Sequence, residues 1–93
     1  EVEEALKHHP SVMDCLVVGI TDAKWGQSIT AVVELNPGFE LEEVELKDFS
    51  RAHLAAYKIP KRILVLDSLE RAPNGKANYK LIKDFAEKTL GVG

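Results

Sequence analysis

One short segment of the chain, Ala72-Pro73-Asn74-Gly75-Lys76, has the residue types needed to present a cation to an anionic substrate. Pro73 fixes one backbone angle and the Asn-Gly pair tolerates left-handed dihedrals, so the segment predicts a tight turn. Such a turn holds the base of the Lys76 side chain in place and leaves its ammonium group pointing outward. A cation held by a rigid loop can stabilise charge on phosphates or carboxylates. Taken alone, however, the segment fits an ordinary surface turn with a solvated lysine more often than an active site.

Other chemical patterns fail because the residues at the required spacing are wrong. A Walker A loop needs a glycine five residues before the Gly-Lys pair and a serine or threonine after it, where this chain has Glu70 and Ala77. His8 and His9 are adjacent, so on a helix they point about 100° apart, and we expect no metal site. Cys15 lies in an apolar run without a second cysteine, which predicts a reduced core residue with a raised pKa. Any catalytic contribution is therefore expected from the lysine of the turn.

The composition indicates a single small globular domain. The chain has 93 residues, of which 45% are hydrophobic and 29% charged. Its formal net charge of −3 argues against nucleic-acid binding, which usually requires a basic excess. No apolar run approaches the roughly 18 residues of a membrane span, and we expect neither a transmembrane segment nor a signal peptide. A reduced Cys15 suits the cytosol, so we expect a cytoplasmic protein. The chain begins without methionine in a helix-like pattern, and we expect it to be a fragment.

The first part of the chain predicts a helix and a hairpin. Residues 1–9 have apolar side chains at helical spacing, and Pro10 ends that helix. Residues 12–20 are rich in Val, Leu and Ile, which indicates a largely buried strand. Residues 28–35 alternate between two faces and predict a half-buried strand, joined to the first by a turn over residues 21–26. The face expected to lie away from the core consists of Ser28, Thr30, Val32 and Glu34.

The second part predicts a strand between two helices. Residues 41–54 are charged and loosely amphipathic, which indicates a helix, and residues 62–66 indicate a strand. Asn78 is a good N-cap for the last helix, and Gly91 is a plausible stop. The resulting order, α-β-β-α-β-α, predicts an α+β domain with a small, mainly antiparallel sheet of about three strands flanked by helices.

Four segments, in order and at sensible spacing, together make a specific pattern. They are Glu1-Val2-Glu3 with His9-Pro10-Ser11-Val12, Val18-Gly19-Ile20 with Asp22 and Trp25-Gly26, Leu54-Ala55-Ala56-Tyr57-Lys58-Ile59-Pro60-Lys61, and Asn74-Gly75-Lys76. With these segments the whole chain resembles the small C-terminal domain of the adenylate-forming (AMP-binding) superfamily. The resemblance is strongest to the acyl-CoA synthetases, or fatty-acid–CoA ligases.

The resemblance implies that residues 1–93 are a mobile C-terminal domain that works with its own large N-terminal domain. In this family a carboxylic acid and ATP give acyl-AMP and pyrophosphate, and the acyl group then passes to CoA. The catalytic lysine of the first step corresponds to Lys76, with Gly75 beside it in the substrate site. A domain rotation then brings another face to CoA, for which Trp25 and Gly26 are candidates. The resemblance places the adenine pocket, the acyl pocket and the Mg²⁺ site in the N-terminal domain.

The chain departs from the family pattern at two positions. Many relatives have a proline at the position of Glu70 and an aliphatic residue at that of Ala77. Because the large domain is missing from these 93 residues, we expect them to have no ligase activity alone. Two alternatives remain open at this point: the adenylation domain of a peptide synthetase, and a non-catalytic α+β interaction module in which Lys76 is idle.

Overall fold

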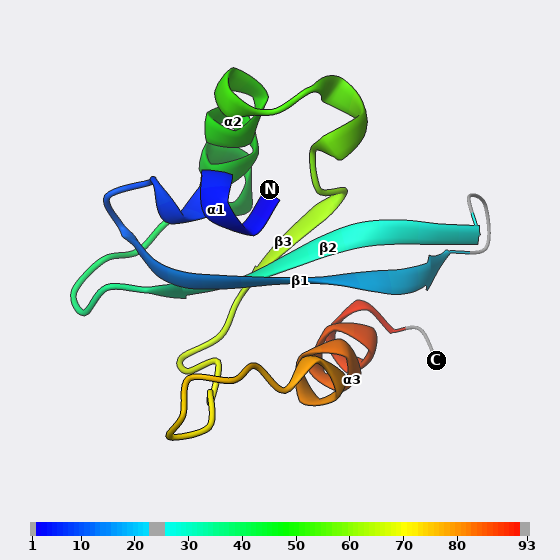
Figure 1. Ribbon diagram of the computed structural model, residues 1–93. Coiled ribbons are helices and arrows are strands. Elements are labelled where there is room, and N and C mark those ends of the chain that lie inside the picture. The colour runs from blue at the N-terminus through cyan, green and yellow to red at the C-terminus, as the bar shows by residue number, and fades with distance from the viewer. Residues whose placement is uncertain (1, 23–25, 92–93) are drawn as a thin grey trace.

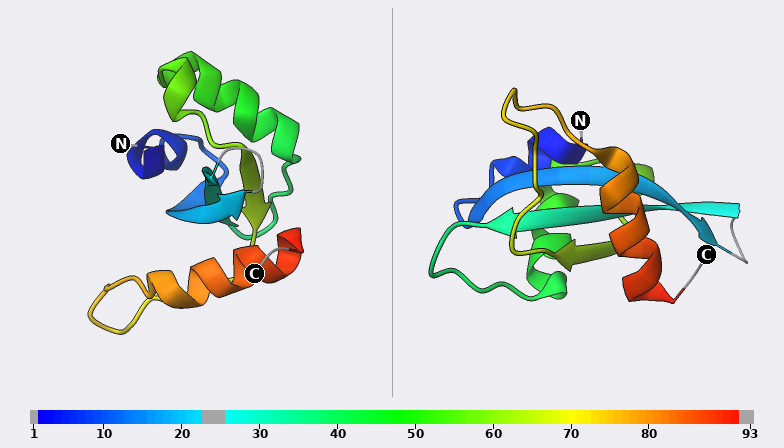
Figure 2. Two further views of the ribbon diagram at one scale, coloured as in Figure 1. Left: turned by 90° about the vertical axis from the view of Figure 1, so that its right-hand side faces the viewer. Right: turned by 90° about the horizontal axis from the view of Figure 1, so that it is seen from below.

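A three-stranded sheet separates two layers of helices (Figure 1). The computed structural model describes residues 2–22 and 26–91. One side of the sheet carries two helices and the other side carries one, as the turned views in Figure 2 show. The first side has α1 (Val2–Lys7) and α2 (Glu43–His53), followed by a 3₁₀ turn, η1 (Ala56–Lys58), and the second side has α3 (Tyr79–Leu90). The predicted α+β class and the order α-β-β-α-β-α are confirmed.

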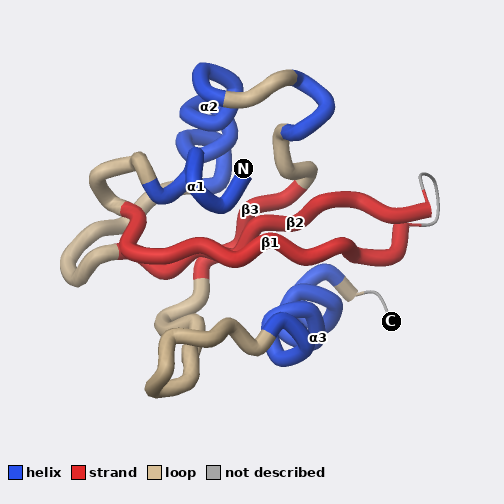
Figure 3. Tube along the Cα trace, in the orientation of Figure 1, coloured by secondary structure: helices blue, strands red, loops and turns tan. Residues whose placement is uncertain are grey.

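The sheet contains one long antiparallel pair and one short parallel pair (Figure 3). The strands are β1 (Val12–Asp22), β2 (Gly26–Leu35) and β3 (Arg62–Val65), in the spatial order β1-β2-β3. β1 and β2 pair antiparallel along their whole length, as a hairpin requires. β3 runs parallel to β2 because α2 carries the chain back across the sheet between them. The predicted mainly antiparallel sheet is confirmed, with a parallel edge strand that the sequence pattern did not indicate.

Both faces of β2 are buried over residues 30–33, so the predicted half-buried strand was wrong there. Thr30 and Val32, expected on the outer face, are fully buried because α3 covers that side of the sheet. The core on the α3 side consists of Leu16, Val18, Ile20, Val32, Leu64, Leu69, Ile82 and Ala86. The core on the α1 and α2 side consists of Leu6, Val12, Cys15, Ala31, Val33, Leu46 and Ile63.

The ends of α3 follow the predicted capping chemistry. The side chain of Asn78 accepts a hydrogen bond from the Leu81 backbone N–H at 3.1 Å, which satisfies one of the open donors at the helix start. Gly91 ends the helix with a φ of +76°, a left-handed conformation that glycine adopts without strain. The N-cap of α3 therefore lies two residues after Lys76, and Ile82 and Ala86 anchor the helix to the sheet.

Candidate functional site

The predicted turn at residues 72–76 is present, and it holds the backbone of Lys76 on both sides. The Gly75 N–H donates to the Ala72 carbonyl at 2.7 Å, and Gly75 has a φ of +84°. The Lys76 N–H donates to Asn74 Oδ1 at 3.0 Å. The Lys76 carbonyl accepts from the Ala72 N–H, also at 3.0 Å. This is the pattern of a three-residue loop in which a type I turn is followed by a left-handed residue.

The Lys76 side chain is exposed at the surface of this turn. Across residues 2–22 and 26–91, no ion pair or side-chain hydrogen bond is found for its ammonium group. Nothing lies within 4 Å of the point where a side chain at Gly75 would begin, so this stretch of backbone is open to an approaching molecule. A rigid backbone with an open surface and an unengaged cation suits an anionic group brought from outside the domain.

Arg71 ties the turn to strand β1. Its Nε and Nη2 atoms donate to the two carboxylate oxygens of Asp14 at 2.5 and 3.1 Å, and its Nη1 donates to the Gly75 carbonyl at 3.0 Å. The hydrogen bond from Arg71 lowers the pKa of Asp14 below its ordinary value of 3.8, against partial burial, which raises it. At neutral pH the carboxylate is therefore ionised and the contact is a charge-assisted, two-point pair.

Tyr79 makes a second link, three residues after Lys76. Its hydroxyl donates to Glu3 Oε2 on α1 at 2.9 Å, and the same oxygen accepts from the Val17 N–H of β1 at 2.8 Å. Partial burial, followed by the hydrogen bond to Glu3, raises the pKa of the Tyr79 hydroxyl, so it stays a donor at neutral pH. The segment around Lys76 is thus linked to the α1–β1 unit on both sides.

Residue Glu70, where the chain departs from the family pattern, adopts a left-handed backbone with a φ of +51°. Proline is held near −65° and cannot adopt this conformation. The sequence departure therefore coincides with a local backbone path that a proline would not allow. Its consequence is to turn the chain immediately before Arg71.

Of the two CoA-side candidates, the structure describes only Gly26, which lies apart from Lys76. Trp25 lies outside the described residues. Gly26 is exposed at the start of β2 with a φ of +82°. The start of β2 and the 72–76 turn lie toward opposite ends of the domain in Figure 1.

Cys15 is a buried free thiol in the core on the α1 and α2 side, as the sequence predicts. Burial raises its pKa to about 12, with a smaller contribution from the nearby charge of Glu3. The thiol therefore stays protonated at neutral pH and is no nucleophile. Among the described residues, no cluster of three or more His, Cys, Asp or Glu side chains could hold a metal ion. None of the described helices has the length and apolar character needed to cross a membrane.

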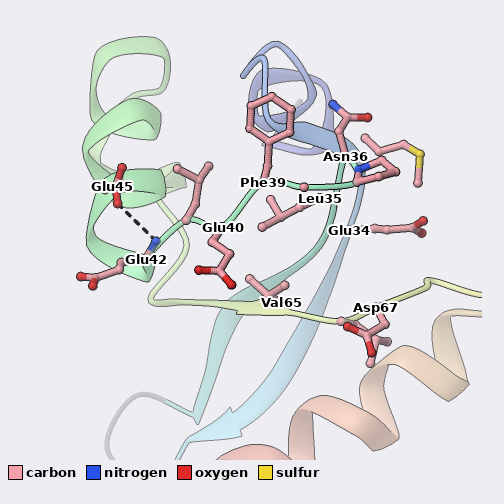
Figure 4. A pocket seen from close by; sticks show the side chains of 14 residues that line it. Glu34, Leu35, Asn36, Phe39, Glu40, Glu42, Glu45, Val65 and Asp67 are labelled. Carbon is pink, nitrogen blue, oxygen red and sulfur yellow. Dashed lines mark hydrogen bonds between the residues drawn. The ribbon is translucent and has the colours of Figure 1, made fainter.

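A groove in the described part of the chain lies away from Lys76 and has the opposite charge. It is an open depression of about 820 Å³ between the loop after β2, the end of β3 and the start of α2 (Figure 4). Its acidic side chains are Glu34, Glu40, Glu42, Glu45 and Asp67. No lysine or arginine is among the described residues that line it, so a phosphate or carboxylate would be repelled here. Of these two surfaces, only the 72–76 turn presents a cation.

The contacts made by Arg71, Asp14, Tyr79 and Glu3 were not predicted from the sequence. Arg71 and Asp14 are 57 residues apart, and Tyr79 and Glu3 are 76 residues apart. No short-range pattern joins residues at such separations. The sequence shows a charged residue, Arg71, next to the predicted turn, but it does not indicate which residue Arg71 contacts.

Comparison with known proteins identifies the family of this chain. A sequence model of the AMP-binding enzyme C-terminal domain family matches residues 1–76. A medium/long-chain-fatty-acid–CoA/3-oxocholest-4-en-26-oate–CoA ligase of Mycobacterium tuberculosis is 44% identical over 87 residues, which cover 94% of this chain and 16% of that protein. The mitochondrial malonate–CoA ligase of Bos taurus is also 44% identical, over 86% of this chain and 14% of its own length.

A solved structure is similar over nearly the whole chain. The fatty acyl CoA synthetase of Mycobacterium tuberculosis superposes with a TM-score of 0.86 and 28% identity, over 96% of this chain and 18% of that one. This chain thus spans less than a fifth of the length of each of these three proteins. The chain belongs to the AMP-binding enzyme C-terminal domain family.

Proposed function

We propose that this chain is the mobile C-terminal domain of an AMP-forming acyl-CoA synthetase and supplies Lys76 as the catalytic residue of acyl-AMP formation. The proposal rests on the difference between the backbone and the side chain of Lys76. Both backbone polar groups of Lys76 are held by hydrogen bonds, while its side chain is exposed on the turn. The names of the similar proteins support a CoA ligase over a peptide synthetase, and family membership disfavours a non-catalytic interaction module.

In the first half-reaction a carboxylate oxygen of the acid attacks the α-phosphorus of ATP. The new carboxylate–phosphorus bond forms as the bond from the α-phosphorus to the bridging oxygen breaks, and pyrophosphate leaves. Both reactants are anions, so their repulsion is part of the barrier. The ammonium of Lys76, placed between carboxylate and α-phosphate, offsets this repulsion and stabilises the charge that develops in the transition state. It acts as an electrostatic clamp and not as a base, with the open backbone at Gly75 allowing close approach.

In the second half-reaction the thiol sulfur of CoA bonds to the acyl carbon, the thiol proton is lost to solvent and AMP leaves. We propose that a domain rotation withdraws Lys76 and presents another surface, with Trp25 and Gly26 as CoA-side residues. The start of β2, whose first residue is Gly26, lies toward the opposite end of the domain from the turn in Figure 1, which supports this division because one end can be presented while the other is withdrawn.

The remaining parts of the active site belong, in this proposal, to a large N-terminal domain that binds ATP, the acid and Mg²⁺. The described residues do not fit an Mg²⁺ site, since they offer no suitable group of ligands. We also propose a cytoplasmic location. The free, buried Cys15 thiol supports it because such a residue suits a reducing compartment.

The test compares the two half-reactions in the full-length parent enzyme. Lys76→Ala should lower the rate of acyl-AMP formation about 10²- to 10³-fold, the usual cost of removing one preorganised donor. Thioester formation from supplied acyl-AMP should stay within about twofold of the unmodified enzyme, because the lysine is withdrawn at that step. Lys88→Ala is the matched control, since it removes an exposed lysine near the other end of α3.

An equal loss in both half-reactions would count against the role of Lys76. Residues 1–93 alone should form no acyl-AMP, and formation above the rate without protein would contradict the proposed division of the active site between two domains.

A further inference from the structure

We infer that Asp14 and Arg71 are positioning residues that hold the 72–76 turn against β1, so that Lys76 reaches the reacting atoms during acyl-AMP formation. We call this pair the Asp14–Arg71 clamp. The inference rests on the proposed role of Lys76 and adds two residues that act through it.

The clamp joins two elements through one rigid group. The guanidinium of Arg71 is planar, and its donors point in fixed directions. Two of them grip the Asp14 carboxylate, and a third holds the Gly75 carbonyl, which belongs to the peptide bond that leads into Lys76. The position of that peptide is therefore set by β1, a strand paired along its whole length with β2.

The carboxylate end of the clamp is itself fixed. Asp14 Oδ1 accepts a hydrogen bond from the Cys15 N–H at 2.8 Å, and the ammonium of Lys7 lies 4.0 Å away. The β1–β2 register shifts between Val12 and Asp14, and such an irregularity redirects the side chains beside it. The Asp14 side chain is only 18% exposed, so solvent competes weakly for its oxygens.

The clamp contributes little to the free energy of unfolding. Arg71 belongs to the exposed part of the loop, and ion pairs near the surface contribute little to the free energy of unfolding. Both hydrophobic cores are complete without it. Positioning is different, because a misplacement of about 1 Å at a reacting group can cost about 100-fold in rate. Removal of the clamp should therefore lower one half-reaction in an enzyme that still folds.

Tyr79 supports the same segment from its other side through Glu3. Because this second link remains when Arg71 is changed, the turn should loosen without unfolding. Loss of the clamp is thus expected to affect the rate of acyl-AMP formation less than loss of Lys76 itself.

The main competing explanation is that Arg71 contacts a phosphate of ATP directly. Substitution of Asp14 distinguishes this explanation from the clamp. Asp14→Asn keeps the positive charge of Arg71 but weakens its anchor. If Arg71 bound ATP directly, Asp14→Asn would leave acyl-AMP formation unchanged and Arg71→Met would mainly raise the KM for ATP. If the clamp positions Lys76, both variants lower kcat and leave that KM unchanged.

The experiment uses the full-length enzyme with Asp14→Asn, Arg71→Met, Arg71→Lys and the Asp14→Asn/Arg71→Met double variant. Each single loss should lower the kcat of acyl-AMP formation about 10- to 100-fold. The double variant should be no slower than the worse single, because the two residues act as one unit. Arg71→Lys should fall between Arg71→Met and the unmodified enzyme, since an ammonium cannot grip the carboxylate and the carbonyl together.

Thioester formation from supplied acyl-AMP and the melting temperature serve as the second readout. Both should stay close to those of the unmodified enzyme in every variant. Arg51→Met is the control, because it removes an exposed arginine paired with Asp48 on α2, away from the turn.

Equal losses in both half-reactions, or full activity of Asp14→Asn, would overturn the clamp. Lys76→Ala is measured in parallel. If it retains acyl-AMP formation, the proposed function fails. If it loses that step while the Asp14 and Arg71 variants keep it, only the clamp fails.

Discussion

The turn at Asn36-Pro37-Gly38 and the turn at Pro73-Asn74-Gly75 are built from the same three residue types. Each places its glycine at a φ of +84°. The first is closed by a bond from the Phe39 N–H to the Asn36 carbonyl, and the Asn36 amide donates to the Pro10 carbonyl at 2.9 Å. The second is closed by its own backbone bonds and held from outside by Arg71.

The difference lies in what surrounds the two turns. The first borders the acidic groove, where no described lining residue is a lysine or arginine. The second presents Lys76 and is anchored by an ion pair to β1. Turn residues thus determine the local backbone shape, whereas the charge placed on the turn and its long-range anchor determine whether it can do chemistry. Three measurements that compare the two turns test this conclusion.

The largest difference is expected for the leucines that anchor the two loops. Leu69 is fully buried in the core on the α3 side, whereas Leu41 is only partly buried against the other core. Leu69→Ala should lower the free energy of unfolding by about 3 kcal/mol, through lost burial and the cavity left behind. Leu41→Ala should cost about 1 kcal/mol. Urea denaturation of the two variants measures both values, and equal losses would show that the loops are anchored alike.

A smaller but more specific difference is expected for the two glycines. An alanine at either position is forced into a left-handed backbone, so Gly38→Ala and Gly75→Ala should each cost about 1–2 kcal/mol of stability. Only Gly75→Ala should lower acyl-AMP formation in the full-length enzyme, because only that turn carries Lys76. Activity measured at matched stability separates the effects. A similar rate loss in Gly38→Ala would remove the functional contrast between the turns.

The smallest difference is expected at acid pH. The hydrogen bond from Arg71 holds the pKa of Asp14 below 3.8, whereas the first turn is anchored by an amide that does not titrate in this range. Because the pKa is lower in the folded state, the stabilisation is present above pH 3.8 and is lost as pH falls through the folded value.

Asp14→Asn should therefore be less stable than the unmodified chain at pH 6, by up to about 1 kcal/mol, and the gap should close toward pH 2. Urea denaturation across this range measures the gap, with Asn36→Ala as the control. A gap that does not change with pH would show that the Asp14 charge adds nothing to the anchor.

Much of the fold could be predicted because the signals are local. The order of the elements, the Asn78 cap and the Gly91 stop each depend on a few neighbouring residues. The burial of both faces of β2 could not be read in the same way. Thr30 is polar and lies in an alternating strand, so its burial follows only from where α3 packs.

The same distinction between local and long-range interactions applies to the candidate site. The 72–76 turn was predicted because Pro73 and Gly75 specify their own backbone geometry. The partner of Arg71 was not, because the contact with Asp14 depends on the assembled sheet and on the path of the loop after β3. The roles of Lys76, Trp25 and Gly26 remain predictions.

The hydrogen bond from the Val17 N–H to Glu3 has a consequence for solubility during folding. β1 is an edge strand of 11 residues, and such an edge offers its unpaired backbone groups to a strand of another molecule. Glu3 occupies one of these groups with a carboxylate, which a second chain would have to displace. Helix α1 therefore shields the longest strand of the domain against edge-to-edge aggregation, and a chain in which α1 has come away would expose it.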